Sequence, residues 1–358
     1  LIPVCLSAAV ICGTFLHMCS ISSRMEGNVR FYTIQVVFTA LVDKAAFAIT
    51  AFWSPVYETA VSVITGGYVL LSIIVFFMKR KKSLQLFNHV EKSGTRMILS
   101  FSVPYLPVLL LSWLNSSIPL FVLRKYVDYS SIGIYTSAVT ISNVLSIIQT
   151  GFSAYWSSFI YEHYKYADNR DKIQKIVKLV VFVLIFTAIS VVLLQDMVYL
   201  MIGERFRAGK LIFPFLMFTP ICNCIGDMTG IGIMLSKKSY LNIITFVCCV
   251  SANFIVSFFL VPRIGIAGAA IAVGISALVT LIIRSFYGMK YYRVCDNGGG
   301  VFKAIILMIC VSVINIVING WQLKYFLIFS CLAGLGIVFR KEIAYLADFV
   351  LRLWAKDR

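Results

Sequence analysis

Eleven long apolar stretches constrain this chain more than any other feature of its sequence. A helix needs about 20 mainly apolar residues to cross a bilayer. The stretches cover residues 2–20, 31–53, 57–78, 98–122, 129–152, 177–195, 211–235, 239–261, 265–287, 302–319 and 324–339. Two of the charge-free runs, 97–123 and 239–262, are longer than a soluble core helix usually is. The strands of a membrane barrel would instead alternate over about ten residues. We therefore predict an all-α integral membrane protein with about 11 transmembrane helices.

The composition supports a membrane protein without a soluble domain. Apolar residues make up 60% of the chain and charged residues only 13%, about half the share of a soluble protein. This excludes disordered, collagen-like and coiled-coil chains. The longest loops between the stretches, 79–97, 161–176 and 288–301, are too short to form a separate catalytic module.

The net charge of +17 is best explained by the orientation of the chain in the membrane. In a soluble protein it would indicate nucleic acid binding. Here 24 of the 32 Lys and Arg residues lie in the loops after alternate stretches and in the tail, and seven lie on the other side. Basic loops are typically cytoplasmic. This predicts a cytoplasmic C-terminus, an amphipathic tail at 341–358 on anionic lipids of the inner leaflet, and no nucleic acid partner.

An odd number of stretches places the N-terminus on the outside. The chain begins with Leu1, directly in an apolar stretch, and shows no signal-peptide pattern. We therefore expect that an odd number of helices precedes it; a processed protein with its N-terminus outside is the alternative.

The residues of covalent and metal chemistry are scarce. The ten cysteines include no Cys-x-x-Cys pair, and the chain has only three histidines. The sequence contains neither a Gly-x-Ser-x-Gly motif nor a phosphate-binding glycine loop. We therefore predict no metal site, no cofactor and no enzymatic activity, and a transporter fits better.

Two ionisable residues lie deep within the second stretch. Lys44 is about nine residues, roughly 13 Å, from one end and about thirteen residues, roughly 20 Å, from the other. Its stem is too short to reach either surface easily. Asp43 precedes it, but neighbours on a helix do not face each other. Each side chain either neutralises the other or needs a cavity or another helix.

Asp227 lies within the seventh stretch, about ten residues or roughly 15 Å from Lys237. It sits between Gly226 and Gly230, a small-residue spacing that lets helices approach closely. An interhelical hydrogen bond and a role in cation coupling are both open.

Polar and basic residues also mark the fourth stretch. It carries three prolines and Asn115, a combination typical of a bent helix beside a lumen, although hydrogen bonding between helices is the alternative. Arg124 ends this stretch on the outside, and Arg284 ends the ninth on the inside. For both arginines, anchoring at the membrane interface is the favoured interpretation.

Three motifs resemble a known family. Residues 101–107 (FSVPYLP), followed by Asn115-Ser-Ser, resemble the helix that opens the second lobe of bacterial polysaccharide flippases. Residues 131–138 (SIGIYTSA) and 260–272 (LVPRIGIAGAAIA) are similar to two further helix-start and turn motifs, the last being the most specific. The chain thus resembles the O-antigen and capsule repeat-unit flippases of the multidrug/oligosaccharidyl-lipid/polysaccharide exporter superfamily.

The resemblance implies a two-lobe, MATE-like fold of 14 helices. On that pattern residues 1–80 form the C-terminal half of the first lobe, 98–287 the second six-helix lobe, 302–340 an additional helix pair and 341–358 the tail. Three helices would then precede residue 1, in agreement with the topology.

The resemblance also implies the function of a flippase in the bacterial cytoplasmic (inner) membrane. Its substrate would be an oligosaccharide unit on undecaprenyl pyrophosphate, used for lipopolysaccharide O-antigen or capsule. Relatives commonly carry Asp-Arg where this chain has Ile118-Pro119, so another cation must bind the anionic substrate. We expect Lys44, Arg124 and Asn115 to contact it, and Asp43 and Asp227 to couple transport to an ion.

Partners and alternatives follow from the same resemblance. A polysaccharide polymerase and a chain-length regulator are possible partners. A multidrug exporter of the superfamily is one alternative, although it should carry more intramembrane acids. A membrane polymerase is another, although it should have a large outer loop, whereas the longest here is about 195–210.

Overall fold

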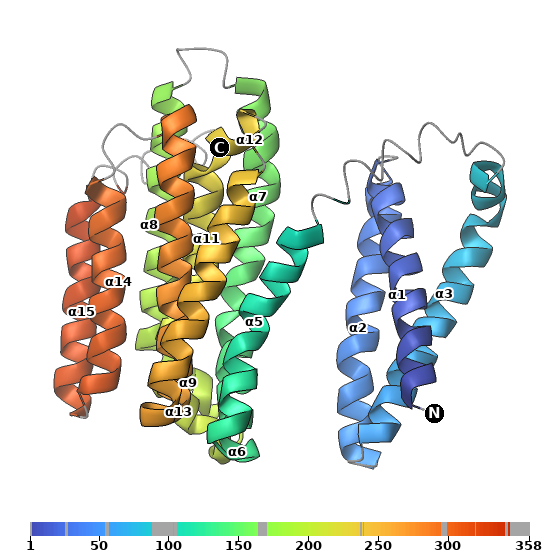
Figure 1. The fold of residues 1–358 in the computed structure, drawn as a ribbon, viewed down its shortest axis with the longest axis horizontal. Helices are drawn as coiled ribbons and strands as arrows, with labels where there is room; N and C mark the ends of the chain where they lie inside the picture. Colours follow the sequence, from blue (N-terminus) through green and yellow to red (C-terminus); the bar gives the residue numbers. More distant parts are fainter. Residues whose placement is uncertain are drawn as a thin grey trace, which may run out of the picture. The chain divides into compact units, whose positions relative to one another are not determined.

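The computed structural model describes residues 2–25, 28–53, 57–87, 103, 106–163, 170–236, 238, 240–294, 299–318, 320–340 and 343. The described residues form helices and no strand, which confirms the all-α prediction. The elements are α1 (Ile2–Met25), α2 (Val29–Trp53), α3 (Tyr57–Phe87), α5 (Leu106–Tyr126), α6 (Tyr129–Ser142), α7 (Val144–His163), α8 (Arg170–Leu193), α9 (Gln195–Leu200), the 3-10 helix η3 (Glu204–Leu211), α10 (Phe213–Leu216), α11 (Phe218–Thr229), α12 (Ile231–Leu235), α13 (Tyr240–Tyr291), α14 (Gly299–Val317) and α15 (Trp321–Val338) (Figure 1). The predicted tail at 341–358 lies outside the described residues, except for Ile343.

The helices fall on the predicted apolar stretches. Within the described residues, seven helices are long and apolar enough to cross a membrane, and a pair bent by 63°, Glu204–Leu211 with Phe213–Thr229, makes an eighth. α13 contains two of the predicted stretches, and α2 and α15 cover two more. The described residues of the predicted stretches are thus largely helical, and the chain is a multi-pass membrane protein.

α13 is a helical hairpin. Its backbone leaves helical geometry at Ile264 and Gly265, where Gly265 has φ 55° and ψ −131°. A Cβ at Gly268 would lie 2.6 Å from the carbonyl carbon of Leu260, so the chain turns back tightly here. Before the first arm, Lys238 Nζ donates to Tyr291 Oη, at the end of the second arm, at 3.3 Å. Both arms therefore return to the same end of the bundle (Figure 1).

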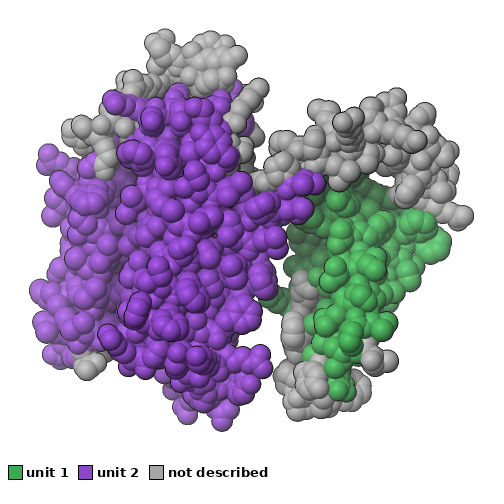
Figure 2. All heavy atoms as spheres, viewed as in Figure 1, with its two compact units in different colours: residues 1–102 green, residues 103–358 purple. Residues whose placement is uncertain are grey.

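The chain divides into two compact units, Leu1–Ser102 and Val103–Arg358 (Figure 2). In the first unit, α1, α2 and α3 pack against one another. In the second unit, α5 packs along α13, and α11 contacts α7, α8 and α13. The division into 1–80, 98–287, 302–340 and 341–358 that the family pattern implies stays a prediction.

α8 lies at the centre of the second unit. Val181, Leu184, Ile185 and Ala188 have no exposed surface. α8 contacts α11 on one side and both α14 and α15 on another. A helix that is apolar all round is expected to be surrounded by others. Through α8, the last helix pair shares one apolar core with the rest of the unit.

We predict that Gly265→Ala destabilises the protein by about 1–3 kcal/mol, because a side chain is strained at this positive φ. The matched control is Gly151→Ala within α7, where a Cβ meets no atom within 4 Å, and the added helix propensity should stabilise slightly. Thermal unfolding in detergent measures both. Equal melting temperatures for the two variants would contradict the strained turn.

Candidate functional site

A group of polar contacts inside the spans of the second unit surrounds Asp227. The Asp227 carboxylate on α11 lies 2.7 Å from Arg284 Nη1 on α13. It also accepts hydrogen bonds from Ser153 Oγ at 2.5 Å and from Gln149 Nε2 at 3.3 Å, both on α7. One carboxylate thus joins three helices. We call these four residues the Asp227 site.

Glycines make room for the arginine. A Cβ on Gly230 would lie 2.7 Å from Cγ and 2.9 Å from Nε of Arg284. A Cβ on Gly226 would lie 3.4 Å from its Cδ. The Gly226–Gly230 spacing therefore accommodates the stem of Arg284 beside the carboxylate of Asp227. A side chain larger than that of glycine at position 230 would occupy the space of the Arg284 stem.

The same segments approach each other closely one turn further along. A Cβ on Gly232 would lie 2.1 Å from the carbonyl oxygen of Gly288, and Thr229 Oγ1 lies 2.7 Å from Ser285 Oγ. The backbones of α12 and α13 are thus in direct contact. Asp227 precedes Gly232 and Arg284 precedes Gly288, each by about one helical turn. The contact between these two glycines therefore keeps Arg284 level with Asp227.

The site holds a charge pair that is only partly exposed. The side chains of Arg284 and Asp227 are 24% and 22% exposed, and Arg284 Nε is buried without a hydrogen-bond partner. Removing one member of a fully buried pair leaves the other charge uncompensated, at a cost of about 3–5 kcal/mol, which is an upper bound for this pair. Separating the two side chains therefore costs free energy, and a cation that binds Asp227 would compete with Arg284.

Of the two interpretations left open for Asp227, the structure supplies an interhelical interaction, an ion pair with added hydrogen bonds. A coupling role stays a prediction. Arg284 differs from its expected role as an interface anchor, because its guanidinium turns to Asp227. The sequence held one signal for this pair. Asp227 lies ten residues before Lys237 and Arg284 six before Lys290, so opposite charges occur about 15 Å and about 9 Å from the same predicted surface, within reach of a long arginine side chain.

Asn115 lies in a second interhelical contact. Asn253 Nδ2 on α13 donates to both the carbonyl oxygen and Oδ1 of Asn115 on α5, each at 2.8 Å. Ser257 Oγ donates to Asn253 Oδ1 at 3.2 Å. Asn253 is fully buried. The contact ties α5 to the first arm of α13, and a role for Asn115 in substrate binding stays a prediction.

Lys44 points away from the helices of its own unit. Gln35 on α2 is buried, and its Nε2 donates to the carbonyl oxygen of Leu16 on α1 at 2.7 Å. Lys44 follows nine residues later, about half a turn around the helix. Its side chain is exposed. It therefore lies on the face of α2 opposite the one that packs on α1.

The other two candidates lie apart from the Asp227 site. Arg124 is exposed, beside Lys125 in the last turn of α5. The side chain of Asp43 lies outside the described residues. Lys44 belongs to the first unit, whereas Asp227 belongs to the second. The described residues hold no group of three His, Cys, Asp or Glu side chains close enough to bind a metal ion.

Comparisons with known proteins add a fold and a relative. The chain superposes on a solved structure of the lipid II flippase MurJ in an inward closed conformation, with a TM-score of 0.64 and 14% identity. The match covers 96% of this chain and 74% of that one. The chain has the fold of a lipid II flippase.

The sequence itself is similar to the capsular polysaccharide biosynthesis protein CapF of Staphylococcus aureus, at 22% identity over 210 residues. These residues are 57% of this chain, and they span about half, 52%, of the relative. No family model matches the chain. Both comparisons confirm the resemblance that the sequence motifs indicate.

We predict that Asp227→Asn lowers the free energy of unfolding by up to about 3–5 kcal/mol, because it leaves the Arg284 charge unpaired. The double variant Asp227→Asn/Arg284→Gln should recover much of this loss. Thermal unfolding of the purified protein measures each, with Glu58→Gln, at an exposed position of α3, as control. A double variant as unstable as the sum of its singles would rule out a coupled pair.

Proposed function

We propose that this protein is a flippase that moves an undecaprenyl-pyrophosphate-linked oligosaccharide unit across the bacterial cytoplasmic membrane for surface polysaccharide synthesis. The observation that carries the proposal is the similarity in fold to a lipid II flippase, with a TM-score of 0.64 over 96% of the chain. The similarity to a capsular polysaccharide biosynthesis protein favours a sugar substrate on the lipid.

The physical problem is to move a polar, anionic head group through an apolar core about 30 Å thick. A cationic lumen lowers this barrier, and the lipid tail can remain in the bilayer. Lys44 is the intramembrane cation that the described contacts leave exposed, on the outer face of α2. We assign it to the substrate head group, together with Arg124 and Asn115.

Ion coupling is assigned to Asp227 and Asp43. Asp227 shares its carboxylate among Arg284, Ser153 and Gln149, which come from two other helices. A proton or metal cation that binds the carboxylate weakens its attraction to Arg284 and so changes how α11, α7 and α13 hold together. This links ion binding to a rearrangement of the second unit.

The orientation that the basic loops favour places the C-terminus in the cytoplasm. The substrate would then be loaded from the side that carries 24 of the 32 basic residues. A polysaccharide polymerase and a chain-length regulator would act on the flipped product. On this proposal the protein is a transporter, not an enzyme, and needs no cofactor.

We predict that Lys44→Ala abolishes or strongly reduces surface polysaccharide, whereas Lys44→Arg, which keeps the positive charge, retains most of it. Cell-surface polysaccharide is measured at matched membrane expression, with Lys303→Ala, an exposed lysine at the start of α14, as control. Unchanged export in both Lys44 variants would remove Lys44 from the substrate site. Translocation of the lipid-linked unit in sealed vesicles tests the function itself, and a protein without it is not this flippase.

A further inference from the structure

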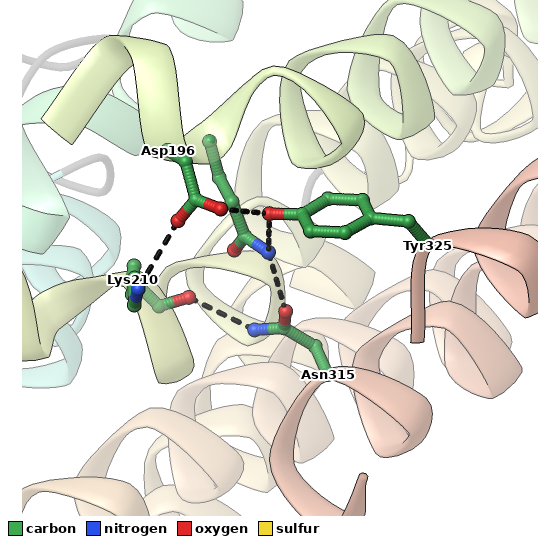
Figure 3. A network of polar contacts seen from close by, with 5 residues as sticks. Asp196, Lys210, Asn315 and Tyr325 are labelled. Carbon is green, nitrogen blue, oxygen red and sulfur yellow. Dashed lines mark hydrogen bonds and ion pairs between the residues drawn. The ribbon is translucent and has the colours of Figure 1, made fainter. Parts of the chain in front are cut away.

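A second polar cluster joins the last helix pair to the rest of its unit. It lies where α9, η3, the end of α14 and the start of α15 meet (Figure 3). We call it the α15 cluster and define it by Gln195, Asp196, Lys210, Asn315, Lys324 and Tyr325. It is separate from the Asp227 site, and the proposed transport function does not use it.

Asp196 on α9 is the single carboxylate of this cluster. Its Oδ1 lies 3.1 Å from Lys210 Nζ on η3, and its Oδ2 accepts a hydrogen bond from Tyr325 Oη on α15 at 2.5 Å. Burial by itself would raise the pKa of Asp196, but the hydrogen bonds from Tyr325 and Lys210 and the charge of Lys210 lower it overall. Asp196 is therefore ionised at neutral pH, and both of its oxygens are already occupied.

Asn315 and Gln195 are the amide members of the cluster and carry no charge. Asn315 Nδ2 on α14 donates to the carbonyl oxygens of Lys210 at 2.8 Å and of Leu211 at 3.1 Å. Gln195 is fully buried beside Asn315. In the orientation drawn in Figure 3, its Nε2 donates to Asn315 Oδ1 at 2.9 Å. The swapped orientation of the amide, which gives its oxygen and nitrogen better partners, places the oxygen 3.2 Å from Lys324 Nζ and the nitrogen 3.0 Å from the Lys210 carbonyl oxygen.

Lys324 leaves the cluster with an excess positive charge. It is only 7% exposed, and among the described residues no carboxylate lies within ion-pair distance of its ammonium group. The cluster thus holds two lysines and one carboxylate, whose oxygens already contact Lys210 and Tyr325. The neighbouring Arg207 and Glu204 pair with each other at 3.2 Å and add no net charge. A buried cation without a full counter-ion is costly.

We propose that the α15 cluster binds a phosphate-type anion, either inorganic phosphate or the phosphodiester of a lipid head group, against Lys324 and Lys210. Such an anion supplies the missing negative charge. The side chains of Lys210 and Asp196 are each 41% exposed, so the cluster opens to the surface on their side. The cluster lies at ends of the predicted spans 177–195, 302–319 and 324–339, where a helix leaves the apolar core of the bilayer. A bound anion would hold α14 and α15 to η3.

The test measures thermal unfolding of the purified protein in a neutral detergent. Additions are inorganic phosphate, phosphatidylglycerol, phosphatidylethanolamine, and chloride at the same ionic strength. We expect phosphatidylglycerol, inorganic phosphate or both to raise the melting temperature by about 2 °C or more. A response to both indicates a site for phosphate in general, and a response to phosphatidylglycerol alone indicates a lipid head group. No shift beyond that of chloride and phosphatidylethanolamine overturns the proposal.

Three variants locate the site. Lys324→Met should abolish the anion-dependent shift and raise the melting temperature without anion, because it removes the excess charge. Lys324→Arg should keep the shift, and the exposed Lys303→Met should leave it unchanged. The proposal is wrong if Lys324→Met keeps the shift, or if it melts lower than the wild type without anion, since Lys324 would then be a required partner of Asp196. It is also wrong if Lys303→Met loses the shift equally.

Discussion

The apolar interior of the membrane offers no water to a polar side chain, and the second unit is built around this constraint. Serine and threonine hydroxyls can donate to carbonyl oxygens of their own helix, as Thr245 and Ser312 do, but a charged side chain within a span needs a partner on another helix. The Asp227 carboxylate meets this demand with Arg284, Ser153 and Gln149. The interaction joins α7, α11 and α13 at one point. Any movement of these helices against one another must break or exchange these contacts.

Glycine determines where the helices can come close enough for this exchange. Gly226 and Gly230 leave space for the stem of Arg284, while Gly232 and Gly288 bring two backbones into contact. At the tip of the α13 hairpin, between its two arms, Gly265 provides the positive φ that reverses the chain. The motif at 260–272, which carries the sequence resemblance, thus has a direct physical basis in the hairpin of α13. Its glycines make the turn and its tight return possible.

Much of the architecture could be predicted from the sequence. The described residues of the apolar stretches are largely helical, and the break at Ile264 and Gly265 lies where two of the stretches meet. The sequence marks Asp227 as an interior charge within a close helix contact. It does not indicate the pairing with Arg284, because an arginine six residues from a loop is usually an interface anchor. Asn115 fits either a lumen or a helix contact, and its partner Asn253 is visible only in three dimensions.

The sequence by itself determined the membrane class and the positions of the apolar helices, and it predicts an orientation. These depend on the transfer free energy and charge of consecutive residues, which are local properties. Only the tertiary structure decided which charges meet. Ser153 and Gln149 lie 74 and 78 residues from Asp227 along the chain, and Asn315 lies 105 residues from Lys210. Such contacts depend on how helices that are distant in the sequence pack against each other. At a glycine, a difference of a few tenths of an ångström in the distance between helices decides whether a side chain fits. No local sequence pattern specifies that packing.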